Sequence, residues 1–396
     1  MEKTGKFFKD FKLNWPHYRA RILGSGNRKG ILYYFLVYFL SITFAFVFLY
    51  PIFYMFMISL MSNTDLVDST IMWIPSRVFF DNYLYAWRGL GLDITFVKGT
   101  FGVLNAVDES TGLAVYTLTE KLQHIETFKF VLVCLLPVFA TYLGRLYTED
   151  KGKLFGTSIF LTVILLFLPK SLTDTLFVSG TTTFVTVISS ALIGYGLARF
   201  KFKLKGFLFV MLLLIYILPK TLLFIPRALM YNEIGIKGTM FALWVPAFFG
   251  SGIQATFFIL IFYQFFSMMP GQIEESAYLD GANSFKIFVR IAIPMATPAF
   301  VIAFVYGFAV NWNETFLTSA YLNAQIDTIP MFLRQLQSTW NSVADFNTSG
   351  SNVNVDYTEA KSFAGTILSI LPLAIMYGFI QRYFIESIDK SGIAGE

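Results

Sequence analysis

Charged residues are scarce in this sequence. Asp, Glu, Lys and Arg make up 14% of its 396 residues, whereas ordinary soluble domains are about a quarter charged. Hydrophobic residues make up 56%, and the mean hydropathy is +0.61. A soluble fold with this balance could not cover its surface with polar groups. The composition therefore excludes an ordinary soluble domain and favours a protein whose solvent is the lipid bilayer.

Cysteine and histidine are almost absent as well. Because the sequence has one cysteine, Cys134, it cannot form an intrachain disulfide. The two histidines, His17 and His124, lie far apart in the sequence. No group of His, Cys and Asp residues has the spacing of a metal site, so we predict no metal ligands.

Motifs for chemistry are missing too. The sequence has no Walker-type phosphate loop, so the chain cannot hold ATP in that way by itself. It has no H-E-x-x-H and no G-x-S-x-G motif. Proton-coupled transporters usually carry buried acids along their path, but the predicted spans hold almost no ionisable residue except Lys220. We therefore predict no catalytic residues and favour transport that a partner powers.

Long uncharged stretches are what the sequence has in abundance. A membrane-spanning helix needs about 20 largely apolar residues, and six stretches meet this requirement. They lie near residues 31–60, 175–198, 206–228, 240–267, 291–313 and 362–381. The basic tail at 1–30 precedes an apolar run that is too long for a signal-peptide core. We interpret 31–60 as an anchor that stays in the membrane, and the tail as cytoplasmic.

Two shorter apolar runs, 130–144 and 154–169, flank a small polar loop. Runs of this length can be re-entrant, interfacial or buried helices. The positive-inside rule places the tail and the basic loop at 199–205 on the cytoplasmic side. Either both short runs cross the membrane, or neither does. We favour a crossing hairpin, which brings the number of membrane helices to eight.

Residues 61–170 form an insertion-rich segment that we predict to begin outside the cytoplasm. Residues 61–127 hold eight acidic and four basic residues, and a low Lys and Arg count suits an external segment. The stretch 94–121 is rich in Thr, Val and aromatic residues around a turn-like sequence, which favours a short β-hairpin. The predicted fold is an all-α integral membrane bundle with a small extracytoplasmic β-hairpin and a permease-like core at 171–396.

The loop at 268–292 is predicted to be cytoplasmic, because two predicted spans separate it from the cytoplasmic loop at 199–205. Glu274 and Glu275 follow Pro270, and acidic residues suit the first turn of a helix. Gly281 then permits a tight bend. We predict a short lateral helix between two spans.

The spacing in this loop resembles the cytoplasmic signature of ABC importer permeases, which reads E-A-A, three residues, G, nine residues, I, one residue, L-P. The matching residues are Glu275-Ser276-Ala277, Gly281, Ile291, Ile293 and Pro294. Ser276 replaces Ala, and Ile293 replaces Leu. In that family the segment is a coupling helix that docks onto a separate ATPase. The coupling residues implied by the resemblance are Glu274, Glu275, Ser276, Ala277, Asp280 and Gly281. The alternative interpretation is an ordinary amphipathic loop helix.

Further matches resemble the maltose-type sugar permeases and extend the resemblance over 31–90 and 171–396. They are Asp81-Asn82-Tyr83, Ser179-Gly180-Thr181-Thr182, Pro219, Pro226, Trp312-Asn313 and Gln381-Arg382-Tyr383-Phe384. Residues 91–170 have no counterpart in the resemblance and form an insertion relative to the family.

The resemblance implies that the chain is half of a translocation pathway for a sugar or oligosaccharide. It implies a second similar permease, an ATPase dimer that holds ATP and Mg²⁺, and an external sugar-binding protein. This chain itself would bind no cofactor and no nucleic acid, and both its termini would be cytoplasmic in the cell membrane. Two alternatives stay open: an ABC permease for another solute such as peptides, and a membrane scaffold or intramembrane enzyme.

Four residues are candidates for the substrate pathway: Lys220, Asn311, Trp312 and Asn313. Lys220 is a charge inside a predicted span and could line the cavity, or it could snorkel to the outer surface. The other three lie at the end of a span, where they could face the cavity or form an interfacial anchor.

Overall fold

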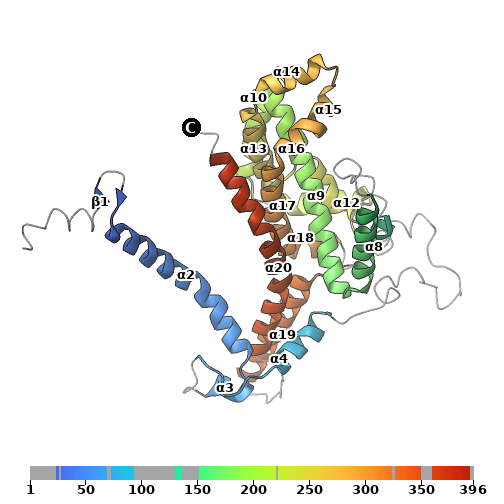
Figure 1. Ribbon diagram of the computed structural model, residues 1–396. Helices are drawn as coiled ribbons and strands as arrows, with labels where there is room; N and C mark the ends of the chain where they lie inside the picture. Colours follow the sequence, from blue (N-terminus) through green and yellow to red (C-terminus); the bar gives the residue numbers. More distant parts are fainter. Residues whose placement is uncertain are drawn as a thin grey trace, which may run out of the picture. The chain divides into compact units, whose positions relative to one another are not determined.

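The computed structural model describes residues 24–25, 28–68, 73–92, 129, 131–135, 151–219, 222–322, 326–348 and 359–392. These residues are predominantly α-helical (Figure 1). The chain divides into two compact units, one formed by residues 1–82 and 358–364, the other by 83–357 and 365–396.

The first unit is built on α2, Ile31–Ser59, a helix of 29 residues. Before it, the short strands β1 (Gly24–Ser25) and β2 (Arg28–Lys29) pair antiparallel. Within the most apolar stretch of 18 residues in α2, no residue is buried. A helix of this length and composition is suited to span a bilayer and to expose its side chains to lipid, so the predicted span at 31–60 is confirmed as a helix.

The chain after α2 is held by polar contacts within the first unit. The Asn82 amide donates to the carbonyl oxygens of Ser59 at 3.0 Å and Met61 at 2.8 Å. Ser62 and Asp65 cap the short helix α3 (Asn63–Val67) reciprocally. Asn82, which belongs to the Asn-Tyr match, thus satisfies carbonyl groups at the end of α2, which a helix leaves without intrahelical partners.

The second unit contains most of the remaining helices. They are α4 (Asp81–Gly89), α8 (Lys151–Phe167), α9 (Lys170–Arg199), α10 (Lys205–Ile217), α11 (Phe224–Glu233), α12 (Phe241–Phe248), α13 (Ile253–Met268), α14 (Gly271–Leu279), α15 (Ser284–Ile287), the π-helical η2 (Phe288–Ala292), α16 (Ile293–Met295), α17 (Thr297–Trp312), α18 (Phe316–Tyr321), α19 (Ile329–Thr348) and α20 (Glu359–Gly392). The first turns of α4 and α20 belong to the first unit.

Helix α9 is the centre of the second unit and packs chiefly against α13, α17 and α12. Small residues permit this close approach, as is usual between membrane helices. A Cβ atom at Gly194 would lie 2.7 Å from the Cβ of Phe262 and 3.0 Å from the backbone nitrogen of Tyr263. Ser189 and Ser190 donate across to the carbonyl oxygens of Ala247 and Ala255. The predicted span at 175–198 lies within α9.

Four helical segments of the described residues are long and apolar enough to cross a membrane. They are Ile31–Ser59, Lys170–Arg199, Phe241–Met268 and Glu359–Gly378. A fifth is possible if the bent pair Ser284–Met295 and Thr297–Trp312 counts as one span. The predicted segment at 362–381 is therefore confirmed as an apolar helical stretch. The segment at 240–267 is apolar throughout but divides into α12 and α13, because Gly250 and Gly252 take positive φ angles between them. The total of eight crossings stays a prediction.

The predicted span at 206–228, which Lys220 interrupts, is not a single helix. α10 ends at Ile217 and α11 begins at Phe224. Pro219 has no N–H to continue the helix, and Leu218 before it is extended, with φ −70° and ψ 124°, as residues before proline prefer.

The predicted helix at 291–313 is bent. The segments Ser284–Met295 and Thr297–Trp312 meet at 77°. Pro298 cannot donate to the carbonyl of Pro294, and the hydroxyl of Thr297 donates to this oxygen instead, at 2.7 Å. The π-helical η2 is a second local cause of irregularity.

The insertion is only partly described. The apolar run at 154–169 forms α8 up to Phe167, and residues 131–135 are helical. Lys129 forms a buried ion pair with Asp174 in the first turns of α9, which ties the insertion to the core. The predicted β-hairpin at 94–121 and the turn of the predicted helical hairpin lie outside the described residues.

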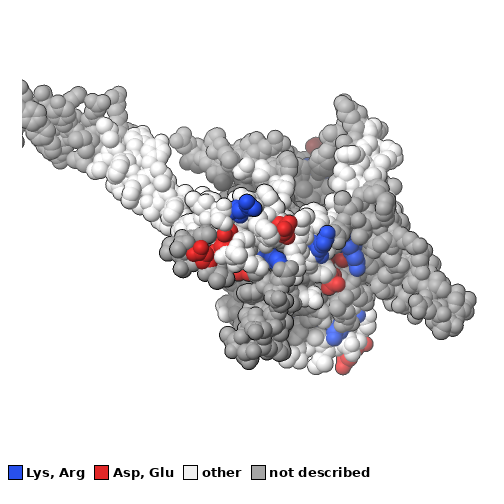
Figure 2. Space-filling view, turned by 90° about the horizontal axis from the view of Figure 1, so that it is seen from below, with Lys and Arg blue, Asp and Glu red and all other residues white. Residues whose placement is uncertain are grey.

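Among the described residues drawn in Figure 2, acidic and basic side chains lie interspersed between uncharged ones.

Candidate functional site

The lateral helix predicted in the 268–292 loop is α14. α13 ends at Met268, Pro270 precedes the first turn of α14, and Gly281 reverses the chain with φ +78°. Asn283 then caps α15, its side chain accepting from the backbone N–H of Lys286 at 2.8 Å. Figure 1 shows α14 lying across one end of the second unit.

One face of α14 is buried against the chain itself. Glu274 and Ala277, three residues apart, are 9% and 8% exposed, and residues at this spacing share a helix face. The hydroxyl of Tyr195 donates to Glu274 Oε1 at 3.2 Å, and Arg199 Nε lies 3.1 Å from the same oxygen. The Arg199 contact is an ion pair without hydrogen-bond geometry. Arg199 also donates through Nη2 to the carbonyl of Met269 at 2.7 Å.

The opposite face of α14 is free within the described part of the chain. Glu275, Ser276, Asp280 and Gly281 are all exposed. Leu279 is 89% exposed, and Phe285 in α15 is 69% exposed. The six implied coupling residues therefore divide into four that face outward and two, Glu274 and Ala277, that face inward.

Leu279 was missed by the sequence argument. Its position four residues after Glu275 puts both on one helix face, so the spacing could have indicated it once the inward face was known. Leu279 therefore adds an exposed apolar side chain to the outward face of α14.

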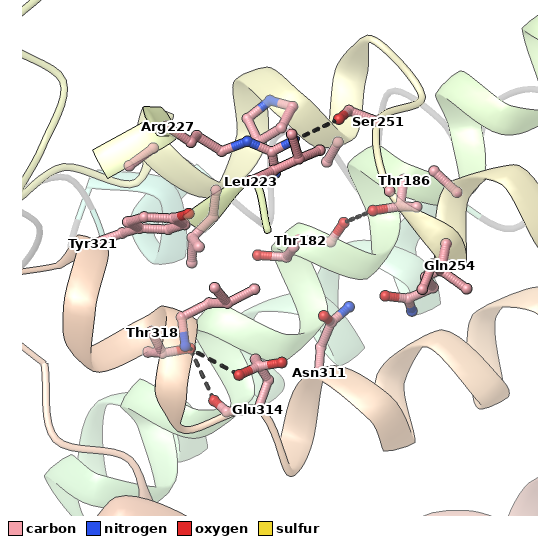
Figure 3. A pocket seen from close by; sticks show the side chains of 18 of the residues that line it. Thr182, Thr186, Leu223, Arg227, Ser251, Gln254, Asn311, Glu314, Thr318 and Tyr321 are labelled. Atoms are coloured by element: carbon pink, nitrogen blue, oxygen red, sulfur yellow. Dashed lines mark hydrogen bonds between the residues drawn. The ribbon is translucent and has the colours of Figure 1, made fainter. Parts of the chain in front are cut away.

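A cavity of about 300 Å³, lined by both apolar and polar residues, lies elsewhere in the second unit. Its polar lining comes from Thr182, Thr186, Arg227, Ser251, Gln254, Asn311, Glu314, Thr318 and Tyr321 (Figure 3). These side chains project from α9, α11, α13, α18 and the loops that precede α13 and α18. Asn311 comes from α17. The volume is at the lower end of the range for small-molecule sites, roughly 300–1,000 Å³.

Hydrogen bonds hold several lining groups in place. Arg227 donates to the hydroxyl of Ser251 at 3.1 Å, and Gln254 donates to the carbonyl of Gly307 at 3.3 Å. The amide of Asn311 donates to Thr183 at 2.9 Å. Glu314 accepts from the backbone N–H of Leu317 at 3.0 Å. In Figure 3 the labelled side chains surround a common space.

The charges around the cavity are balanced. Arg227 and Glu314 are the charged residues of the described lining, one of each sign. Burial raises the pKa of the Tyr321 hydroxyl, Arg227 opposes the shift and Glu314 adds to it. Tyr321 therefore stays protonated at neutral pH and can donate a hydrogen bond. The lining offers donors and acceptors for an uncharged polar molecule.

The predicted pathway residues fall in different places. Asn311 lines the cavity. Trp312 is 2% exposed and packs in an apolar cluster with Phe308 and Ile329. Asn313 is exposed and donates to the carbonyl of Ala309. Lys220 lies outside the described residues.

Arg227 and Glu314 were not among the pathway residues predicted from the sequence. Arg227 lies at the end of the predicted span 206–228, and Glu314 directly follows the predicted span 291–313. Both are ionisable residues at span ends, where a charge is more often taken for an interfacial residue than for a cavity lining.

Residues 190–390, half of the chain, match the model of the family described as "Binding-protein-dependent transport system inner membrane component". The matched range contains all of α14 and most elements of the cavity. The chain belongs to this family. It is a permease subunit, hence a transporter component and not an enzyme, and a multi-pass inner-membrane protein.

Curated relatives agree with the family. The probable ABC transporter permease protein YurM of Bacillus subtilis is 29% identical over 227 residues, which are 56% of this chain and 68% of that protein. The lactose transport system permease protein LacG of Rhizobium radiobacter is 26% identical over 243 residues, 60% of this chain and 82% of LacG. The arabinooligosaccharides permease AraQ of Halalkalibacterium halodurans is 24% identical over 242 residues, 61% of this chain and 74% of AraQ.

A solved structure shares the fold of this permease. It is a chain of a bacterial ABC transporter involved in the import of the acidic polysaccharide alginate. The TM-score is 0.51 and the sequence identity is 19%, with 89% of this chain and 96% of that chain covered. At this identity the likeness concerns the fold alone.

Proposed function

We propose that this permease forms one half of the translocation pathway of an ABC importer for a sugar or oligosaccharide. The observation that carries the proposal is the two-sided α14. Its inner face is fixed to α9 through Glu274, and its outer face exposes Leu279 beside Glu275. A short helix presented in this way suits docking onto a separate ATPase, and the exposed residues Glu275, Ser276, Asp280 and Gly281 form the contact.

The cavity supports a hydroxylated substrate. A sugar hydroxyl both donates and accepts hydrogen bonds, and the lining offers the Arg227 guanidinium and the Glu314 carboxylate together with amides and hydroxyls. One charge of each sign leaves the described lining without net charge, which favours a neutral ligand. Relatives named for lactose and for arabinooligosaccharides support the same substrate class.

The partners follow from the same proposal. An ATPase dimer binds ATP and Mg²⁺, a second permease completes the pathway, and an external sugar-binding protein delivers the substrate. The family description, which names a binding-protein-dependent system, supports the last partner. In this proposal both termini lie in the cytoplasm, with eight membrane helices between them. Asn311 is part of the substrate pathway.

The test is uptake by the purified complex in lipid vesicles that contain ATP. Radiolabelled lactose and an arabinooligosaccharide are offered with a substrate-binding protein from the same operon, and a labelled tripeptide serves as the rival solute. We expect uptake of a sugar and none of the peptide. Uptake of the peptide alone would contradict the sugar assignment.

A matched pair of variants tests the cavity. Gln254→Leu removes an amide from the cavity, whereas Gln264→Leu changes an exposed residue of the same helix. A hydrogen bond left unmade in a closed site costs about 1–3 kcal/mol. We expect Gln254→Leu to lower sugar uptake roughly tenfold and Gln264→Leu to leave it near wild type. Equal uptake by both variants would show that the cavity is not part of the pathway.

A further inference from the structure

The adjacent glutamates of α14 have opposite environments. Glu275 is exposed, whereas Glu274 is buried against α9. A buried carboxylate is costly unless it is paired and hydrogen-bonded. Glu274 meets this condition through Tyr195 at 3.2 Å and Arg199 at 3.1 Å. Glu274 is therefore engaged within the chain and is not available to a docked protein.

Both partners of Glu274 belong to the last turns of α9. Arg199 contacts Glu274 within α14 and also donates to the carbonyl of Met269, the residue that follows α13. One guanidinium thus holds the start of α14 at two points. The Tyr195 ring packs on Phe266 and Phe288, with ring centroids 5.3 Å and 5.0 Å away.

The same α9 helix also lines the cavity. Thr182 and Thr186 line the cavity, and Thr182 lies about 20 Å along the helix from Tyr195, at 1.5 Å of rise per residue. Between the two sites, Gly194 brings α9 into direct contact with the backbone of α13. α9 is therefore a continuous helix that contacts α14 at one end and the cavity further along.

We propose that Glu274 is a positioning residue that fixes α14 to α9, so that a displacement of α14 moves the cavity wall. The proposal rests on the proposed function, because it assumes that an ATPase displaces α14. Glu274 acts through Tyr195 and Arg199, and Glu275 on the outer face meets the ATPase. The two neighbouring glutamates of the coupling segment thus have separate tasks, one inside the chain and one at its surface.

The experiment measures the distance between α9 and α14. Spin labels are placed at Phe184→Cys on α9 and Gln272→Cys on α14, both exposed positions, in a Cys134→Ser background. The full complex in nanodiscs is studied by double electron–electron resonance, without nucleotide and after trapping with ATP and vanadate. We expect one narrow distance distribution that is the same in both states.

Glu274→Gln is the deciding variant. It keeps an acceptor for Tyr195 but removes the charge that pairs with Arg199. We expect a broader distance distribution and a loss of substrate-stimulated ATPase activity by roughly 5-fold or more, the lower end of typical coupling factors. Tyr195→Phe removes one hydroxyl, and we expect it to give a smaller change in the same direction. Unchanged distributions and stimulation in both variants would overturn the proposal.

Glu275→Gln is the matched control. We expect it to leave the α9–α14 distance unchanged and to reduce the amount of ATPase that co-purifies, whereas Glu274→Gln retains the ATPase in the complex. If the wild-type chain captures no ATPase at all, the proposed function fails. If the wild type is coupled but Glu274→Gln behaves as wild type, only the positioning role fails. A broadened distance in Glu275→Gln would also contradict the division of tasks.

Discussion

Single side chains determine local order even in a chain with so little charge. Asp65 is a clear case, because the Ser76 hydroxyl donates to its carboxylate at 2.5 Å and the Ser62 backbone N–H donates at 3.3 Å. The hydrogen bond from Ser76 is the largest cause that holds the pKa of Asp65 below its ordinary value of 3.8, while burial opposes the shift.

This shift predicts an acid-sensitive segment. Because the pKa is lower in the folded state, the stabilisation of α3 is fully present above pH 3.8 and is lost as pH falls through the lowered pKa. We expect Ser76→Ala to move the Asp65 titration toward pH 3.8. Carboxyl carbon chemical shifts measured against pH check this, and a midpoint that does not rise in Ser76→Ala would contradict it.

Gly281 is the second residue with a specific conformational role. Its φ of +78° is left-handed, and a Cβ atom added there would meet no atom within 4 Å. The cost of a substitution therefore comes from the backbone, roughly 1–2 kcal/mol for an ordinary L-residue. Asn tolerates this conformation better than Leu.

We expect Gly281→Leu to insert in the membrane but to lower sugar uptake, because the turn after α14 shifts. Gly281→Asn is the control and should retain most of the uptake. Uptake assays at equal expression check this pair. Normal uptake by Gly281→Leu would show that the turn geometry does not matter for coupling.

At the scale of the helix, close packing of α9 on α13 is the main requirement. A Cβ at Gly194 would meet Phe262 and backbone atoms of α13, whereas a Cβ at Gly196 has its nearest neighbour, Phe200, at 4.0 Å. Overpacking costs typically about 1–3 kcal/mol. In a helix, alanine is otherwise preferred to glycine by about 1 kcal/mol.

We therefore expect Gly194→Ala to lower the thermal unfolding midpoint in detergent, and Gly196→Ala to leave it unchanged or raise it. Unfolding followed by circular dichroism checks both variants. Equal midpoints for the two would contradict the assigned α9–α13 contact.

The helices also show what the sequence could predict. Uncharged runs predicted α2 and α9 correctly, because a helix that spans the bilayer needs about 20 largely apolar residues in sequence. The helix break after Ile217 was missed, although Pro219 and the extended Leu218 account for it. The 77° bend before α17 was missed, although Pro298, which cannot donate to the carbonyl oxygen of Pro294, lies next to the junction.

For the candidate site, the sequence predicted the helix but not the orientation of its side chains. Pro270, the glutamate pair and Gly281 correctly predicted a lateral helix at α14. Which glutamate faces inward could not be read from the sequence, because it depends on Tyr195 and Arg199, far away along the chain. Asn311 was found at the cavity, whereas Trp312 proved to be core packing.

At the scale of the whole molecule, the proposed importer role makes this permease depend on other proteins. The outward face of α14 is the surface that we propose to meet a separate ATPase. The exposed Leu279 is the most direct probe of that dependence, since a charged side chain there places an unpaired charge in an apolar contact.

The most direct test of the account is purification of the tagged chain in mild detergent with mass spectrometry of the co-purifying proteins. The account predicts that the wild type and Leu279→Met bring an ATPase and a second permease, and that Leu279→Glu keeps the permease but loses most of the ATPase. A wild-type chain that purifies alone, or a Leu279→Glu chain that retains as much ATPase as the wild type, would contradict it.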